Sequence, residues 1–319
     1  MLGPMQIQPA VRGKLTKITE GQVGAPRLSG DGKTVVWNEW VDGQWEVMRY
    51  KDGKILCLSK DAAHDISPQV SHDGDVVVWS RFNQERGDWD VYQWRNGTVT
   101  PVADSPADEM SPAVSADGRT IVWTHDDISQ PIGFDIYKWR EGEGVEQVTS
   151  GGPVDTDPFV NADGSWIFFR RKVQFDGGDL WMRDHQGVCK PITHTTTAEF
   201  TPTATYDGMK IAWSQADKDD HDIYLFECEG SYLTPIAAQR GVDERDPVMT
   251  SDGQTMAWSE SSPGSLSQIV IRENGQKQQI TAEGSNAWPQ LSADGRTMAW
   301  QHYDPDTRAV ALYHFERDA

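Results

Sequence analysis

The sequence predicts an all-β fold, a seven-bladed β-propeller built from four-stranded blades. Three observations predict it. A nine-residue phrase that contains Asp-Gly and ends on an aromatic residue occurs seven times, and a proline precedes each copy by three residues. These prolines recur every 42 to 46 residues. The intervening segments are rich in β-branched and aromatic residues and show no apolar pattern of helical length. A period of about 40 to 50 residues with four strands per unit is typical of a propeller blade.

The second repeat illustrates how each blade is expected to form. We expect strands over residues 69–71, 75–80, 89–94 and 99–102. Asp73-Gly74 turns the chain between the first two strands, and Asn96-Gly97 turns it between the last two, because Gly and Asn adopt positive φ at low cost.

The two chain ends predict how the ring closes. The last repeat supplies three strands, over 290–292, 296–301 and 308–315, and no fourth. Segment 13–19 precedes the first repeat and resembles the fourth strand expected at 276–281. We therefore expect residues 15–19 to complete the last blade, which would remove an open sheet edge. The expected organisation is an N-terminal tail over 1–12 and one propeller domain over 13–319.

The charge balance limits the classes of partner. A net charge of −20 with a pI near 4.7 argues against nucleic acid and anionic membrane surfaces, which require a basic protein surface. No apolar run reaches membrane-spanning length, so no membrane span is expected. We expect a monomer. The compartment stays open: cytoplasmic if the N-terminus is native, periplasmic or secreted if a leader has been removed.

The repeated phrases resemble those of a known family. Ser-x-Asp-Gly before an apolar strand, followed by Asp90-Val91-Tyr92 or its equivalents, is similar to the repeats of TolB-type propellers. Those repeats usually read Ser-Pro-Asp-Gly, whereas the proline is replaced in every copy here. The replacements are Gly30, His72, Ala116, Ala162, Tyr206, Ser251 and Ala293. The resemblance covers residues 13–319 and implies the fold only, since such blades serve several functions. TolB has a six-bladed ring and an additional α/β domain, so its partners are not carried over.

Two repeated positions are interpreted as structural. The Asp-Gly pairs should form turns in which Asp accepts hydrogen bonds from the turn backbone. The aromatic residue that ends each second strand should pack between blades. These aromatic residues are Trp37, Trp79, Trp123, Phe169, Trp213, Trp258 and Trp300.

A third repeated position carries the candidate site. It lies three residues before each proline, where the chain should enter its innermost strand near the channel mouth. Val23 occupies it in the first repeat, and the other repeats carry Asp65, Glu109, Asp155, Glu199, Glu244 and Asn286. Converging carboxylates raise one another's pKa unless a cation lies among them. The sequence therefore predicts an acidic mouth that binds a metal ion, a polyamine or a Lys/Arg-bearing protein. In the alternative interpretation these side chains cap turns or pair with neighbours such as Arg27 and Arg245.

Other charged segments of the same face leave the cofactor open. Acidic loops at 125–127, 217–222 and 304–306 contain ligands suited to hard cations such as calcium, but none completes a twelve-residue calcium loop. Solvated loops are the alternative. His125 and His302 occupy equivalent positions in two repeats, and residues 170–172, Arg-Arg-Lys, are a local basic exception.

No catalytic residue is assigned, because the chain contains no Gly-x-Ser-x-Gly elbow, P-loop, dinucleotide fingerprint or His-Glu-x-x-His motif. The main hypothesis is a non-enzymatic binding propeller. One alternative is a channel-mouth enzyme, a metal-assisted lyase or hydrolase that uses the carboxylates with His125 or His302. Another is a carbohydrate-binding propeller with exposed aromatic residues. Its candidates are Trp40, Trp45, Trp89 and Trp288.

Overall fold

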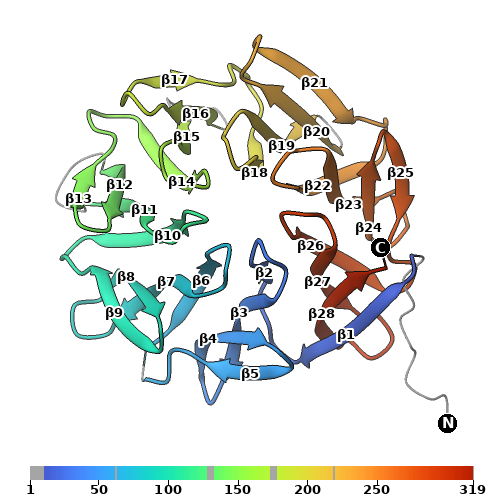
Figure 1. Ribbon diagram of the computed structural model, residues 1–319, viewed down its shortest axis with the longest axis horizontal. Helices are drawn as coiled ribbons and strands as arrows, with labels where there is room; N and C mark the ends of the chain where they lie inside the picture. Colours follow the sequence, from blue (N-terminus) through green and yellow to red (C-terminus); the bar gives the residue numbers. More distant parts are fainter. Residues whose placement is uncertain (1–10, 62, 128–132, 173–177, 218–219, 319) are drawn as a thin grey trace.

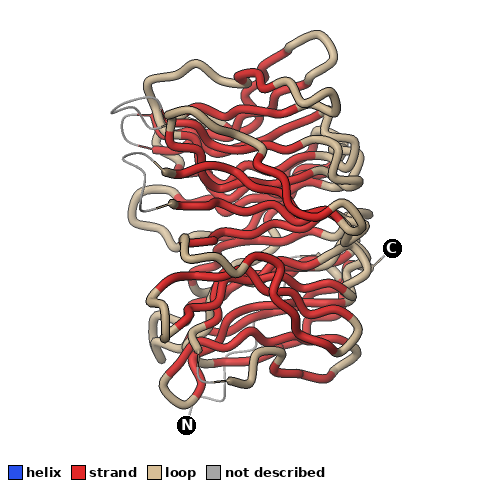
Figure 2. Tube along the Cα trace, turned by 90° about the vertical axis from the view of Figure 1, so that its left-hand side faces the viewer, coloured by secondary structure: helices blue, strands red, loops and turns tan. Residues whose placement is uncertain are grey.

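The structure is a computed structural model that describes residues 11–61, 63–127, 133–172, 178–217 and 220–318. It is a ring of seven four-stranded antiparallel sheets (Figure 1), which confirms the predicted seven-bladed β-propeller. Figure 2 shows that the strands run between two faces and that the loops gather on those faces. Among the described residues, none forms a helix suited by length and apolarity to crossing a membrane. The expected tail, 1–12, lies outside the described residues except for 11 and 12.

Each blade runs from an innermost strand at the central channel to an outermost strand at the rim. Blade 1 contains β2 (Arg27–Leu28), β3 (Thr34–Val41), β4 (Gln44–Lys51) and β5 (Lys54–Cys57). Blade 2 contains β6 (Asp65–Val70), β7 (Val76–Asn83), β8 (Asp88–Arg95) and β9 (Thr98–Ala103). Blade 3 contains β10 (Asp108–Val114), β11 (Thr120–Asp126), β12 (Phe134–Arg140) and β13 (Gly144–Gln147). Blade 4 contains β14 (Val154–Val160), β15 (Ile167–Lys172), β16 (Asp179–Arg183) and β17 (Cys189–Pro191).

The remaining three blades repeat this order. Blade 5 contains β18 (Glu199–Ala204), β19 (Lys210–Asp217), β20 (Asp220–Glu227) and β21 (Tyr232–Ala237). Blade 6 contains β22 (Asp243–Met249), β23 (Thr255–Ser261), β24 (Gln268–Glu273) and β25 (Gln276–Gln279). Blade 7 contains β26 (Ser285–Leu291), β27 (Thr297–Tyr303), β28 (Val310–Arg317) and β1 (Gly13–Glu20).

Blade 7 joins the two ends of the chain, as the sequence predicts. β1 pairs antiparallel with β28 as the outermost strand, so the N-terminal segment covers the edge that β28 would expose (Figure 1). Ile18 of β1 packs in a buried cluster with Leu312 of β28 and Trp37 of blade 1. The closing strand thus contributes to the core as well as to the sheet.

The innermost strands begin earlier than expected. In blade 2 the sequence predicts a strand from residue 69, whereas β6 starts at Asp65 and continues through a break in register between Ile66 and Gln69. Pro68 lies within this break, where its missing N–H removes no ladder hydrogen bond. The same irregularity recurs in the innermost strands of blades 3 to 7.

The Ser-x-Asp-Gly turns are structural, as predicted. In blade 1, Ser29 Oγ donates to Asp31 Oδ1 at 2.6 Å, and the Lys33 N–H donates to the same oxygen at 3.0 Å. The turns of neighbouring blades also bond to one another around the channel. Seven backbone hydrogen bonds close this circle; their donors are the N–H groups of Asp31, His72, Asp117, Ala162, Tyr206, Ser251 and Ala293. Each blade is therefore tied to both neighbours on this side, which we call the turn face.

The repeated aromatic residue is buried and packs between blades as predicted, but it lies inside the second strand, which continues beyond it, rather than at its end. Trp79 of blade 2 shares a cluster with Val36 and Val47 of blade 1. Trp300 of blade 7 shares one with Ala257 and Ile271 of blade 6. Burying a large aromatic side chain contributes about 1.5 to 3 kcal/mol, so these residues hold the wedge-shaped blades together.

Candidate functional site

The six predicted site residues lie on the face opposite the turn face, which we call the carboxylate face. Each is the first or second residue of an innermost strand, and each is 0 to 2% exposed. Their side chains contact partners within or beside their own blade rather than one another. Direct contact of these residues with a ligand stays a prediction.

The partner of each carboxylate follows a simple rule that sequence reasoning missed. The residue sixteen positions later lies opposite it on the second strand, where it determines whether the buried charge is neutralised. From blade 2 to blade 7 these partners are Arg81, His125, Arg171, Gln215, Glu260 and His302. The constant spacing is visible in the sequence, but its meaning depends on the register of the first two strands.

Blades 2 and 4 neutralise their aspartates with an arginine. Arg81 Nε lies 2.8 Å from Asp65 Oδ1, and its guanidinium is 4.4 Å from the ring centre of Tyr92. Arg171 makes two bonds of 2.7 Å to Asp155 and lies 4.5 Å from the ring centre of Trp181. Burial raises the pKa of Asp65, and the Arg81 guanidinium opposes that rise. The basic segment at 170–172 thus serves the blade itself, since Arg170 also pairs with Asp157.

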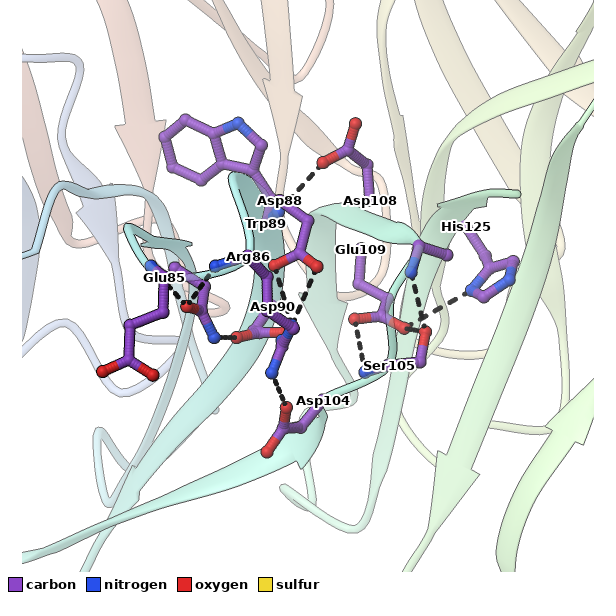
Figure 3. A network of polar contacts seen from close by, with 12 residues as sticks. Glu85, Arg86, Asp88, Trp89, Asp90, Asp104, Ser105, Asp108, Glu109 and His125 are labelled. Atoms are coloured by element: carbon purple, nitrogen blue, oxygen red, sulfur yellow. Dashed lines mark hydrogen bonds and ion pairs between the residues drawn. The ribbon is translucent and has the colours of Figure 1, made fainter. Parts of the chain in front are cut away.

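Blade 3 places a serine and a histidine beside its glutamate instead (Figure 3). Glu109 accepts a hydrogen bond from Ser105 Oγ, and its Oε1 lies 3.5 Å from His125 Nδ1. The His125 ring packs against the Tyr137 ring at 4.3 Å between ring centres, with the planes tilted by 35°. In blade 7, Asn286 replaces the carboxylate and contacts His302 Nδ1 at 3.0 Å.

A second network in Figure 3 gathers acidic residues around one arginine beside Glu109. Arg86 Nε pairs with Asp88 at 2.8 Å, its Nη1 pairs with Asp104 at 2.7 Å, and its Nη2 pairs with Asp90. These carboxylates, Asp88 foremost, raise the pKa of Arg86. Burial raises the pKa of Asp90 to about 6. The network orders the loop between the second and third strands of blade 2.

Blades 5 and 6 differ because their partners carry no positive charge. Glu199 Oε1 accepts a bond from Thr195 Oγ1 at 2.6 Å, and Glu244 Oε1 accepts one from the Gln239 N–H at 3.4 Å. No described residue donates to the Oε2 atom of either glutamate, although both atoms are buried. Burial raises the pKa of Glu199 to about 7 and that of Glu244 to about 7. Two adjacent blades therefore retain unsatisfied acidic groups.

The channel itself is lined by a different set of residues. A cavity of about 460 Å³ lies on the ring axis, and its walls include the residue before each proline and the residue after it. From blade 2 to blade 7, the residue before the proline has a positive φ. It lies at the bulge of the innermost strand, and the bulge turns it towards the channel. These residues are Ser67, Ser111, Asp157, Thr201, Asp246 and Trp288.

Trp288 is the exceptional member of this set. Its φ is 52°, a conformation that is unfavourable for a bulky side chain, and 40% of its surface is exposed. The charged residues of the lining are Arg27, Asp157 and Asp246. Burial is the main reason that the pKa of Asp246 is raised and that of Arg27 is lowered. The charge of Arg27 partly opposes the rise for Asp246, and the charge of Asp246 partly opposes the fall for Arg27.

The turn-face end of the channel is crossed by a side-chain contact. Tyr206 Oη lies 2.6 Å from His72 Nδ1, and these residues come from blades 5 and 2. Gly30 faces the same contact, and a Cβ at this position would collide with both side chains. Burial raises the pKa of Tyr206 to about 12, so its hydroxyl stays protonated. These residues occupy the position where TolB-type repeats carry proline.

The residues considered for the alternative functions, catalysis and carbohydrate binding, are spread over several blades. His125 and His302 each bond within their own blade. Trp40 packs edge-on against Trp45 at 5.4 Å and stacks on His64 at 5.8 Å on the carboxylate face of blade 1. Trp89 contacts Phe82 in blade 2.

The expected divalent cation has no donor set in the described chain. Across the described ranges, no three His, Cys, Asp or Glu side chains gather closely enough to hold a metal ion. The buried carboxylates already accept bonds from within or beside their own blades, which leaves isolated oxygens rather than a coordination shell.

Comparison with known proteins identifies the architecture. A solved oligogalacturonate lyase in complex with manganese aligns over 99% of this chain and 97% of its own, with 12% identity and a TM-score of 0.73. A second oligogalacturonate lyase, from Vibrio parahaemolyticus, aligns over 98% and 96%, with 12% identity and a TM-score of 0.74. The shared feature is the fold. TolB from Acinetobacter baumannii aligns over 85% of this chain and 66% of its own, with 15% identity and a TM-score of 0.56. Models of protein families and curated protein sequences gave no match.

These likenesses support a propeller with TolB-like neighbours, while the specific Ser-Pro-Asp-Gly repeat type is not confirmed. Oligogalacturonate lyases and TolB both occur among the neighbours, and the shared fold does not separate a binding function from an enzymatic one. Because one neighbour was solved in complex with manganese, a divalent cation is compatible with this fold. The described residues of this chain, however, form no metal site.

Proposed function

We propose that this protein is a non-enzymatic binding module whose ligand or partner enters the central channel from the carboxylate face and presents a cationic group there. The observation that carries the proposal is Trp288, a half-exposed indole held in an unfavourable backbone conformation inside the channel. Strained residues concentrate where a ligand is bound. The face of an exposed indole also attracts cations.

The charges around the channel favour the same sign of ligand. The lining carries the carboxylates of Asp246 and of Asp157, which Arg170 pairs from outside the lining, and the guanidinium of Arg27. Behind the lining, Glu199 and Glu244 have partners that supply no cation, so each adds negative charge when it is ionised. With a net charge of −20, the whole molecule attracts basic ligands over acidic ones.

The direction of entry follows from the contact between Tyr206 and His72. Their side chains cross the channel at the turn face, whereas Trp288 and Asp246 line the cavity beyond it. A ligand that enters from the carboxylate face reaches Trp288 without displacing that contact.

A carbohydrate ligand is the second candidate, favoured by the aromatic cluster of Trp40, which is exposed, with the half-buried Trp45 and His64. Sugar rings stack their apolar faces on aromatic side chains, and two full-length structural neighbours are lyases named for oligogalacturonate. The acidic charge of this chain disfavours an acidic sugar, so we rank this candidate second.

A thermal-shift comparison separates the two candidates. Wild type, Trp288→Ala and Trp40→Ala are heated with spermidine, with neutral oligosaccharides and with oligogalacturonate. A ligand at a hundred times its Kd adds about 2.7 kcal/mol of stability. We expect spermidine to raise the Tm of wild type and Trp40→Ala but not that of Trp288→Ala. A shift with a saccharide alone, lost in Trp40→Ala, would replace the first proposal with the second.

A further inference from the structure

We propose that blade 6 contains a second binding site, specific for a guanidinium group, in the crevice between blades 5 and 6. The site is a cavity of about 310 Å³ that shares no lining residue with the central channel. Its lining residues from blade 6 include Glu244, Trp258, Arg272 and Lys277, and the end of blade 5 supplies the remaining wall through Gln239 and its neighbours.

Two positions explain the cavity, because blade 6 carries different residues there from those of the blades compared below. Opposite the buried Trp, the third strand carries an aromatic residue in blades 2, 3, 4, 5 and 7, whereas blade 6 carries Val270. The position that holds an arginine in blades 2 and 4 holds Glu260 in blade 6. Blade 1, which has Met48 opposite Trp37, also contains a side cavity, of about 490 Å³. The blade 6 cavity reaches Trp258, whereas the blade 1 cavity is lined by Met48 and not by Trp37.

The ligand chemistry is given by the protein's own blades 2 and 4. In both, a guanidinium bonds the buried aspartate and lies over an aromatic ring, as Arg171 does with Asp155 and Trp181. Blade 6 supplies the carboxylate of Glu244 and the indole of Trp258 around a cavity. Trp258 is equivalent to Phe169, whose ring centre lies 5.2 Å from the Arg171 guanidinium. Glutamate is one methylene longer than aspartate, which extends its carboxylate towards a group that comes from outside the blade.

The buried Glu244 side chain supplies the independent observation. It is 1% exposed, it lines the cavity, and its Oε2 receives no hydrogen bond from any residue in the described ranges. A buried carboxylate oxygen without a donor is unfavourable, so a donor from a ligand would stabilise it.

The other charges around the cavity are already engaged. Lys277 Nζ bonds both Glu260 oxygens, at 2.9 and 2.8 Å, and Arg272 Nη1 is 3.5 Å from the Ile236 carbonyl oxygen. Asp222 adds negative charge near Glu244. An anion drawn by Lys277 or Arg272 would meet the Glu244 carboxylate, whereas a planar guanidinium can bond that carboxylate and stack on Trp258.

Isothermal titration calorimetry with arginine amide tests the site, with citrulline amide as the neutral isostere and lysine amide as the non-planar cation. We expect wild type to bind arginine amide at least tenfold more tightly than either control. Glu244→Gln should weaken that binding at least tenfold. Glu260→Arg, which gives blade 6 the arginine found in blades 2 and 4, should abolish it and raise the Tm.

Two further variants show whether the binding belongs to blade 6 alone. Glu199→Gln changes the equivalent glutamate of blade 5 and should leave the Kd for arginine amide within twofold. Trp288→Ala removes the indole of the proposed channel site, so binding of arginine amide that persists in this variant and is lost in Glu244→Gln belongs to blade 6, and failure of the channel proposal is distinguishable from failure of this one. Equal binding of arginine and citrulline amides, no binding by wild type, or undiminished binding by Glu260→Arg would each overturn the proposal.

Discussion

Glu244 faces Glu260 across the first two strands of blade 6, at the register position where Asp65 faces Arg81 in blade 2. One repeated position thus holds a neutralised ion pair in one blade and two carboxylates in another. The repeat fixes where a buried acid lies, and the residue sixteen positions later decides whether its charge is balanced.

The ion pair of blade 2 should be a strong contributor to stability once formed. Asp65 is fully buried, so Arg81→Ala would leave its carboxylate without a cation. We expect a loss of about 3 kcal/mol in the free energy of unfolding, measured by urea denaturation. Arg119→Ala is the matched control, because Arg119 and Glu141 form an exposed pair and its loss should cost less than about 1 kcal/mol. Equal losses in the two variants would contradict this account.

Glu199 and Glu244 should make the folded protein less stable as the pH rises. A buried carboxylate whose pKa is lowered by a cation would have the opposite effect. Burial raises the pKa of Glu199 and of Glu244 from 4.5 to about 7, so the folded protein binds more protons than the unfolded chain between these values. Their stabilising contribution is present below pH 4.5 and is lost as the pH rises towards 7. Glu199→Gln and Glu244→Gln should therefore raise the stability relative to wild type by about 1 kcal/mol or more at pH 8.

Denaturation of these two variants and wild type at pH 5 and pH 8 provides the check. The advantage of each Gln variant over wild type should shrink at pH 5, where the wild-type glutamates are protonated in the folded state. An advantage that is constant across this range would show that proton binding by Glu199 and Glu244 is not its cause.

The contact that crosses the channel predicts a coupling among three blades. Gly30→Ala should destabilise the protein by about 1 to 2 kcal/mol, since its Cβ would displace Tyr206 and His72. In a Tyr206→Ala background the same change should cost far less, because the obstructing hydroxyl is gone. A double-mutant cycle measures the difference, and simple additivity would argue against the contact.

The closing strand should be required for a stable ring. Ile18 of β1 lies in the cluster formed with Leu312 and Trp37, so Ile18→Ala should cost about 2 to 4 kcal/mol of unfolding free energy. Lys14→Ala alters an exposed residue of the same strand and serves as control. If Ile18→Ala unfolds like wild type, β1 contributes little to holding the ring closed.

The sequence predicts the architecture well because the same pattern of residues recurs in each blade. The Asp-Gly phrase and its proline define seven units, and the match of segment 13–19 to a fourth strand predicts that β1 completes blade 7. The sequence places the strand of Asp65 too late, from residue 69, because it does not reveal the bulge at Pro68.

The geometry of the site is less accessible from sequence. The burial of Asp65 depends on its register with Arg81, and that register passes through the bulge at Pro68, which no strand periodicity reveals. The bulge also turns the residue before the proline into the channel. The sequence therefore indicates Trp288 as an exposed aromatic residue but not as part of the channel lining.

The most direct test of the central claim is isothermal titration calorimetry of spermidine against wild type, Trp288→Ala and Asp246→Asn at low and physiological salt. The account predicts binding by wild type that weakens as salt rises and that falls at least tenfold in both variants. An unchanged Kd in Trp288→Ala and Asp246→Asn, or no binding by wild type, would contradict a cation-binding channel.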